Sequence, residues 1–185
     1  MLICSQGAQA NDTVFETLLL ISTLKRNGAT SISLYMPYAA YARQDKMVGP
    51  WRSLAFSDLS TYYQASGIDR VITLDIHNEA VMGCFTQNIN AHNMTAVNMA
   101  AKYMTKMANL RNMVILSPDE GGVKRAKKFF DEYQHQPDHV NRDTKFMIMM
   151  KHRERPNEVA SMTINGDVSG RACMLIDDMI DTGVV

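Results

Sequence analysis

The chain has 185 residues and 46% of them are hydrophobic, which is enough to bury a core in one domain or in two small ones. Lysine plus arginine and aspartate plus glutamate number 19 each, so no global charge draws the protein to nucleic acid or to an anionic membrane, and any phosphate binding must be local. No apolar run approaches membrane-spanning length. The three cysteines, Cys4, Cys84 and Cys173, are odd in number and widely spaced, which favours reduced thiols and predicts a cytoplasmic location.

Helical and extended segments alternate along the chain. The first predicted helix, residues 11–27, has Asn11 or Asp12 as its cap and Gly28 after its end. Further helices are predicted at residues 53–65, 94–108 and 123–133. Short apolar strands are predicted at residues 31–35, 70–75, 113–117, 146–150, 160–164 and 172–176. This alternation favours the α/β class, with parallel sheets that helices cover on both faces.

The order of these segments predicts two domains, residues 1–93 and residues 94–185, with the boundary near Met94. The polar, aperiodic segment 134–144 predicts a surface loop. In open α/β sheets, ligands bind beyond the carboxyl ends of the strands, so the polar clusters that follow strands are the candidate sites.

The first such cluster follows the strand predicted at residues 31–35. It contains Tyr38, Tyr41, Arg43, Gln44 and Asp45. Aromatic rings beside a cation and an amide could stack on a base and contact phosphate oxygens. A solvated loop with two aromatic rings tucked into the core is the alternative.

The second cluster is Asp75-Ile76-His77, at the end of a buried strand. Residues i and i+2 of an extended segment point to the same side, so a carboxylate and an imidazole could share one metal ion or a metal-bound nucleotide. Alternatively, His77 only donates a hydrogen bond to a neighbouring carbonyl.

The third cluster joins the strand predicted at residues 113–117 to a helix, through Asp119, Glu120, Gly121 and Gly122. The glycines let backbone amides approach a ligand closely, while an acid beside them can hold a hydroxyl group or a hydrated cation. A plain strand-turn-helix connection is the alternative, but two adjacent acids before two glycines exceed what a turn needs.

The fourth cluster, the most specific, begins with Asp177 and Asp178 at the end of a strand and continues through Asp181, Thr182 and Gly183. The carboxylates could bind ribose hydroxyls, and the amides that start a following helix could bind a phosphate.

Away from the strand ends, Lys151, Arg153 and Arg155 place three cations within five residues. They indicate either a solvated surface or a loop that closes over a polyphosphate.

Taken in this order, the segments resemble the ribose-phosphate diphosphokinase (PRPP synthetase) family. The matching stretches, which cover nearly the whole chain, are residues 11–12, 37–46, 75–85, 117–125, 151–159, 166–168 and 177–183. The resemblance implies two tandem type I phosphoribosyltransferase-like domains with parallel sheets flanked by helices. It also implies assembly into dimers or hexamers. The implied reaction is transfer of the diphosphoryl group of ATP to the C1 hydroxyl of ribose 5-phosphate, with Mg²⁺ as the cofactor, giving PRPP and AMP.

The resemblance also implies roles for single residues. Contacts to adenine and the ATP phosphates are expected from Arg43, Gln44, Asp45 and His77. Contacts to ribose 5-phosphate are expected from Asp119, Asp177, Asp178, Asp181, Thr182 and Gly183. Contacts to Mg²⁺ are expected from Asp75, His77 and Asp119. The expected catalytic pair is Lys151 and Arg153.

The chain departs from the family pattern at both ends. It begins late, and Val184 and Val185 stand where the sugar-phosphate loop should carry a glycine and a hydroxyl residue. We therefore expect a fragment in which both domains are incomplete and which is inactive alone. Two other functions compete: a non-catalytic, synthetase-like regulatory subunit and a phosphoribosyltransferase. The diphosphokinase is favoured because the cluster at Arg43 and the pair of Lys151 and Arg153 are both present.

Overall fold

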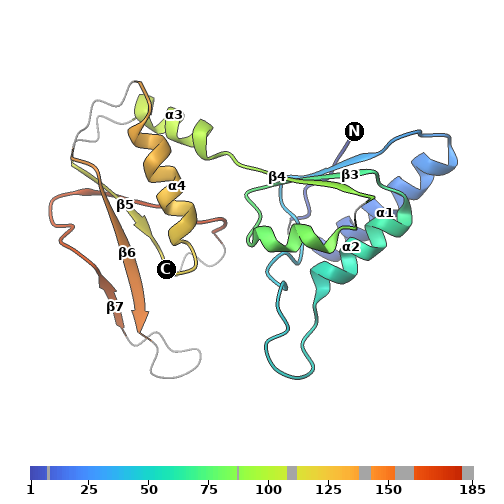
Figure 1. The fold of residues 1–185 in the computed structure, drawn as a ribbon, viewed down its shortest axis with the longest axis horizontal. Helices are drawn as coiled ribbons and strands as arrows, with labels where there is room; N and C mark the ends of the chain where they lie inside the picture. The colour runs from blue at the N-terminus through green and yellow to red at the C-terminus, as the bar shows by residue number, and fades with distance from the viewer. Residues whose placement is uncertain (8, 87, 108–111, 138–142, 153–160, 181–185) are drawn as a thin grey trace. The chain divides into compact units, whose positions relative to one another are not determined.

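The protein divides into two compact units. The structure, a computed structural model, describes residues 1–7, 9–86, 88–107, 112–137, 143–152 and 161–180. The first unit is Met1–Thr95 and the second is Ala96–Val185. Figure 1 shows a sheet with helices in each of them.

The first unit contains a four-stranded parallel sheet. Its strands are β1 (Leu2–Ile3), β2 (Ser33–Met36), β3 (Arg70–Leu74) and β4 (Asn90–Met94), in the spatial order β1-β2-β3-β4. The strands predicted near β2 and β3 are confirmed. The sequence did not indicate β4, because its residues Asn-Ala-His-Asn-Met lack an apolar run, and Met94 ends this strand instead of starting a helix.

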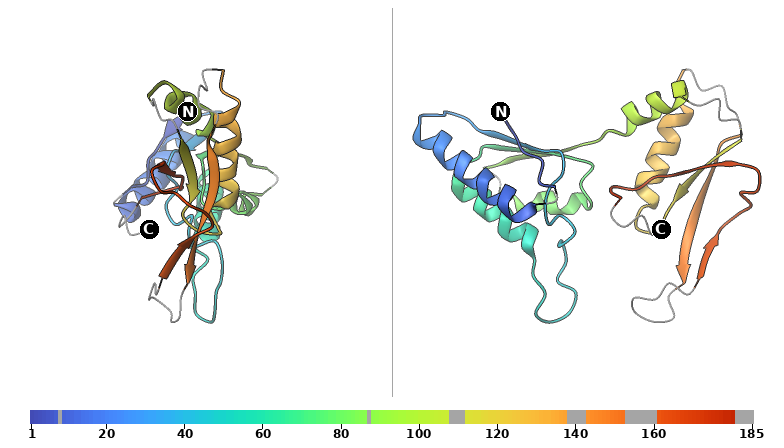
Figure 2. Two further views of the ribbon diagram at one scale, coloured as in Figure 1. Left: turned by 90° about the vertical axis from the view of Figure 1, so that its left-hand side faces the viewer. Right: turned by 180° about the vertical axis from the view of Figure 1, so that it is seen from behind.

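Three helices of the first unit belong to its core. They are α1 (Ala10–Arg26), α2 (Ala55–Ser66) and the short 3₁₀ helix η1 (Glu79–Cys84). The helices α1 and α2 share one face of the sheet in Figure 1 and in the right-hand view of Figure 2, whereas the sequence predicted helices over both faces. Ile21 of α1 and Tyr63 of α2 are buried with Leu34 and Val71 of the strands. The αL residue Gly67 ends α2, as glycine after a helix predicts.

Asp69 ties the carboxyl end of α1 to the start of β2. Its Oδ2 accepts hydrogen bonds from Lys25 Nζ at 3.1 Å and from the Ile32 N–H at 2.7 Å. The bond from Ile32, followed by the bond from Lys25, lowers the pKa of Asp69. A carboxyl whose pKa is lowered on folding stabilises the protein above its ordinary pKa, about 4, and this contribution is lost as the pH falls through the lower, folded value.

We expect Asp69→Ala to destabilise the first unit by about 1 kcal/mol at pH 7, because the buried Ile32 N–H loses its acceptor. The deficit should shrink when the pH falls below about 4. Urea unfolding at pH 7 and pH 3 measures both effects. The control is Glu16→Ala, which removes an exposed acid from α1. An equal loss in both variants would contradict the role of Asp69.

The second unit contains a mixed sheet with the order β7-β6-β5-β8. The strands are β5 (Met113–Ser117), β6 (Lys145–His152), β7 (Ser161–Ile164) and β8 (Ala172–Leu175). Strand β5 is parallel to β6 and β8, but β7 is antiparallel to β6, so the prediction of a purely parallel sheet is wrong here. Only eight residues separate β6 from β7, and a parallel crossover needs about a dozen or more.

The helices α3 (Val97–Met107) and α4 (Val123–Gln134) pack against one face of this sheet. Met113 and Ile115 of β5 are buried there with Phe129 and Tyr133 of α4. On the opposite face, β5 contributes to a smaller cluster of Val114, Leu116 and Met147, against which Ile164 and Val168 pack. Because β5 is buried on both faces, the core fixes the position of its carboxyl end, where the following residues begin. None of the helices that the structure describes is long and apolar enough to cross a lipid bilayer.

Candidate functional site

In the first unit, the turn after β2 carries the first polar cluster. Ala39, Ala40 and Ala42 are buried, which anchors the turn on the core. The Gln44 N–H donates to the Tyr41 carbonyl at 2.8 Å, and Tyr41 has a φ of 60°. Arg43 and Gln44, which follow the buried alanines, are exposed. The alternative of two aromatic rings in the core does not hold for Tyr38, whose exposure is 41%.

Asn78 joins this turn to the segment that follows β3. Its Nδ2 donates to Asp45 Oδ2 at 2.6 Å, while its Oδ1 accepts the Ala80 N–H at 3.1 Å and caps η1. The structure thereby brings the Arg43–Asp45 loop beside the segment that carries Asp75 and His77. Asn78 was not among the residues predicted from the sequence, although an asparagine before a helical segment is a typical cap signal.

Asp75 is held between β3 and β4. Its N–H donates to the Met94 carbonyl at 2.8 Å, and its Oδ1 accepts the Thr95 hydroxyl at 2.6 Å. Its φ is 43°, in the left-handed region that aspartate tolerates better than most residues. The backbone is therefore not extended at Asp75, whereas the prediction assumed an extended segment. A metal shared by Asp75 and His77 stays a prediction.

In the second unit, Asp119 closes the connection between β5 and α4. Its Oδ1 accepts the Gly122 N–H at 2.8 Å, and the Ser117 hydroxyl donates to its carbonyl at 2.7 Å. A Cβ at Gly122 would lie 3.0 Å from Ser117 Oγ, whereas a Cβ at Gly121 would have Asp119 Oδ1 as its nearest neighbour, at 3.4 Å. Close packing, and not a positive φ, therefore favours glycine at position 122.

We expect Gly122→Ala to weaken the second unit by about 1 kcal/mol, because the added methyl group displaces the bonded Ser117 hydroxyl. The neighbouring Gly121→Ala is a matched control with the same chemical change, and it should cost less. Thermal unfolding of both variants measures the difference. If Gly121→Ala proved the more destabilising, the packing argument would be wrong.

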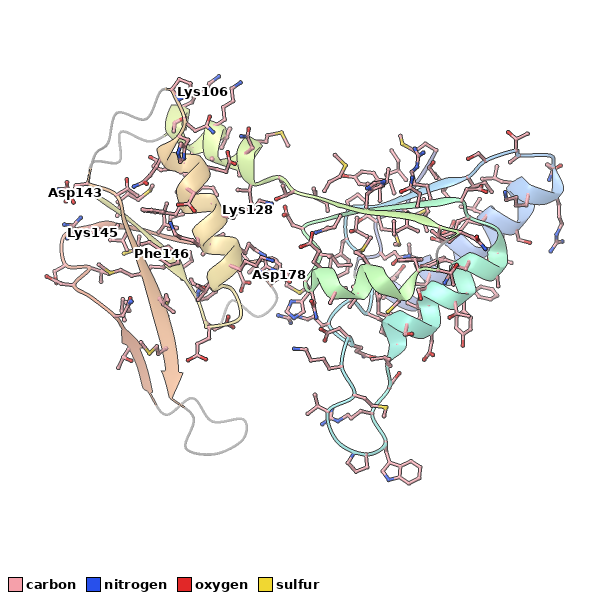
Figure 3. The ribbon with its side chains drawn as sticks, in the orientation of Figure 1. Lys106, Lys128, Asp143, Lys145, Phe146 and Asp178 are labelled. Atoms are coloured by element: carbon pink, nitrogen blue, oxygen red, sulfur yellow. The ribbon has the colours of Figure 1, made fainter. Side chains whose placement is uncertain are left out.

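Two acids follow β8 at the same edge of the sheet. Strands β5 and β8 are parallel neighbours, and the Ile176 N–H donates to the Leu116 carbonyl at 3.1 Å. Asp119 and the pair of Asp177 and Asp178 therefore follow adjacent carboxyl ends. Figure 3 shows Asp178 at the amino-terminal end of α4.

Arg125 of α4 contacts both of these acids. Its Nη1 lies 3.3 Å from Asp178 Oδ1 and 3.5 Å from Asp177 Oδ1. The side chain of Asp178 is 4% exposed and that of Asp177 is 38% exposed. Partial burial, together with the hydrogen bond and negative charge of Asp178, raises the pKa of Asp177, and Arg125 opposes the rise. No role was predicted for Arg125 from the sequence, since nothing local indicates which helix faces β8.

This arrangement can recognise a polyol beside an anion. Carboxylate oxygens at a sheet edge accept hydrogen bonds from hydroxyl groups, and the amino-terminal amides of α4 favour negative charge. Among the described residues, no three His, Cys, Asp or Glu side chains gather to hold a metal ion. Lys151 lies in β6, but its side chain is not among those that the structure describes. Arg153, Asp181, Thr182 and Gly183 also lie outside the described residues.

Known proteins resemble the chain along nearly its whole length. The family model of the N-terminal domain of ribose phosphate pyrophosphokinase matches residues 1–67. A ribose-phosphate pyrophosphokinase of Helicobacter hepaticus is 40% identical over 175 residues, which are 95% of this chain and 53% of that protein. Another of Rhizobium meliloti is 34% identical over 98% of this chain and 55% of its own length.

A solved structure agrees with these relatives. The crystal structure of phosphoribosylpyrophosphate synthetase from Mycobacterium smegmatis has a TM-score of 0.84 and 30% sequence identity, and the match covers 98% of this chain and 55% of that one. The chain thus spans about half the length of the relatives it matches. Residues 1–67 match the N-terminal domain of the family, and by sequence and by fold nearly the whole chain is similar to about half of a ribose-phosphate pyrophosphokinase.

Proposed function

We propose that the protein containing this chain is a ribose-phosphate diphosphokinase. It transfers the diphosphoryl group of ATP to the C1 hydroxyl of ribose 5-phosphate and releases PRPP and AMP. The observation that carries this proposal is the edge formed by β5 and β8, where Asp119, Asp177 and Asp178 gather near Arg125 and the start of α4. The relatives named as ribose-phosphate pyrophosphokinases support the same reaction.

The first unit would bind the nucleotide. Arg43 and Gln44 are exposed beside Asp45, whose carboxylate is held by Asn78, so an aromatic base and phosphate oxygens could reach this loop. His77 follows on the adjacent segment and would face the phosphates. Holding these side chains on one edge limits the reorganisation that binding requires.

The second unit would bind ribose 5-phosphate. Asp177, Asp178 and Asp119 would accept hydrogen bonds from the ribose hydroxyls. Asp181, Thr182 and Gly183 would supply hydroxyl and amide donors to the 5-phosphate. Lys151 and Arg153 would meet the negative charge that develops on the transferred group, because diphosphoryl transfer depends on alignment and cations more than on a covalent nucleophile.

Mg²⁺ is the cofactor we propose. A protein usually holds it through one or two carboxylates, and substrate phosphates complete its coordination. Each unit offers a carboxylate of this kind: Asp75 in the first unit, oriented by the Thr95 hydroxyl, and Asp119 in the second unit, oriented by the Gly122 N–H. When bound, the ion neutralises phosphate charge.

We expect Asp75→Ala and His77→Ala to raise the Mg²⁺ concentration needed for half-maximal activity by about tenfold at fixed ATP. Titration of Mg²⁺ in a rate assay measures this. The controls are Asp58→Ala and His92→Ala, which remove an exposed acid and an exposed histidine of the same unit. Unchanged curves for both test variants would leave Asp75 and His77 with structural roles alone.

The protein would act in the cytoplasm on small molecules, without nucleic acid or membrane partners, and as a homo-oligomer. Phe15 and Leu19 of α1, 63% and 55% exposed, support self-association, because large apolar side chains on one helix favour burial against a second chain. Light scattering after size-exclusion chromatography tests this, and a monomer at micromolar concentration would contradict it.

The proposed reaction is tested with Mg·ATP and ribose 5-phosphate in the protein that contains this chain. Phosphorus NMR should show AMP and PRPP in equal amounts. A regulatory subunit would bind the substrates without forming either product. A phosphoribosyltransferase would consume PRPP when a base is added. Either of these outcomes would overturn the proposal.

A further inference from the structure

Gln6, between β1 and α1, is a buried amide for which the proposed chemistry gives no role. It is 1% exposed. Its Nε2 donates to the Tyr63 hydroxyl of α2, and its Oε1 accepts the Ala40 N–H at 2.9 Å. Its backbone N–H donates to the Tyr38 carbonyl at 3.3 Å. Gln6 therefore contacts both sides of the turn that precedes Arg43.

These contacts fix the turn more firmly than its own sequence would. A buried amide without partners is costly, so Gln6, Tyr63 and the Ala40 N–H favour one shared arrangement. Burial raises the pKa of Tyr63 to about 12, so its hydroxyl stays neutral at any pH near neutrality. Further along, the Tyr41 hydroxyl donates to Asn11 Oδ1, and Asn78 holds Asp45. The loop of Arg43 and Gln44 is thus held on both sides.

We propose that Gln6 is a positioning residue for nucleotide binding. Its amide, supported by Tyr63, fixes the backbone at Ala40 so that Arg43, Gln44 and Asp45 are presented to the nucleotide in one geometry. This inference rests on the proposed nucleotide site of the first unit. It predicts that loss of the amide loosens the loop and weakens Mg·ATP binding beyond what a general loss of stability would do.

The variants are chosen to separate positioning from stability. Gln6→Leu keeps a side chain of similar bulk but removes both side-chain hydrogen bonds. Tyr63→Phe removes the hydroxyl and leaves the bond from Ala40 to Gln6, so its effect on the turn should be smaller. The matched control is Ser60→Ala. Ser60 is 1% exposed, like Gln6, and lies on α2 with Tyr63, but its hydroxyl donates to the Ser57 and Cys84 carbonyls instead.

Hydrogen exchange of the 185-residue chain tests the hold on the turn without any ligand. Amides of residues 38–46 should exchange about 10-fold faster in Gln6→Leu than in the parent, while Ser60→Ala leaves them unchanged. Equal exchange in Gln6→Leu and the parent, or equal acceleration in Ser60→Ala, would overturn the proposal. If Gln6→Leu fails to fold, Tyr63→Phe is compared with the parent and with Ser60→Ala in its place. Exchange equal to that of the parent, or equal acceleration in Ser60→Ala, would then overturn the proposal.

Titration with Mg·ATP tests the consequence for binding. The single tryptophan, Trp51, is fully exposed and follows Asp45 by six residues, so its fluorescence reports on the loop. The Kd should rise about 10-fold in Gln6→Leu and stay unchanged in Ser60→Ala. Faster exchange with an unchanged Kd would refute the positioning role. A parent without any response, checked by calorimetry, would refute the proposed nucleotide site, whereas the exchange data would still decide whether Gln6 holds the turn.

Discussion

Lys151→Ala is expected to lower the kcat of the protein that contains this chain by about 100- to 1,000-fold, with less than about a threefold change in ATP affinity. Diphosphoryl transfer develops negative charge on the transferred oxygens. A cation that meets this charge lowers the barrier without adding much to ground-state binding. Initial rates of AMP formation and calorimetry with ATP measure the two quantities separately.

The control for this variant is Lys128→Ala, which removes an exposed lysine from α4 and makes the same change in charge (Figure 3). Its kcat should equal that of the parent. A loss of ATP affinity as large as the loss of turnover would mean that Lys151 binds the ground state. Normal turnover in Lys151→Ala would end its catalytic role.

Arg125→Met is expected to destabilise the second unit by about 2 kcal/mol at pH 7 and to weaken ribose 5-phosphate binding at least about 10-fold. The variant keeps the apolar stem but removes the cation that contacts Asp177 and Asp178. The expected cost is below that of a fully buried ion pair, because solvent screens Asp177, which is 38% exposed. Chemical unfolding and calorimetry with ribose 5-phosphate measure the two effects.

The dependence of this cost on pH has a definite sign. Without Arg125, the pKa of Asp177 should rise further, because Arg125 opposes the rise that burial and Asp178 cause. A carboxyl whose pKa is raised on folding stabilises the protein below its ordinary pKa, about 4. This contribution is lost as the pH rises from that value through the higher, folded pKa. The deficit of Arg125→Met should therefore be larger at pH 7 than at pH 4. The control is Lys124→Met, an exposed neighbour on α4, and equal deficits in the two variants would contradict the pairing.

The sequence by itself determined the local elements. The 3.6-residue periodicity and the glycine stop predicted α1, and Gly67 marked the end of α2, because caps and amphipathic faces depend on neighbouring residues. The apolar run of β5 and the acids after β5 and β8 could also be recognised from the sequence alone. The family resemblance followed from the order of such segments, and the comparisons with known proteins confirm it.

The tertiary structure alone decided which of these segments meet. The parallel pairing of β5 and β8 brings Arg125 to acids more than 50 residues away, and Gln6 reaches Tyr63 across 57 residues. Strand β4 forms from polar residues because it completes the sheet beside β3. Local propensity contains no information about such partners. They are selected when the whole chain buries its apolar faces and pairs the polar groups left inside.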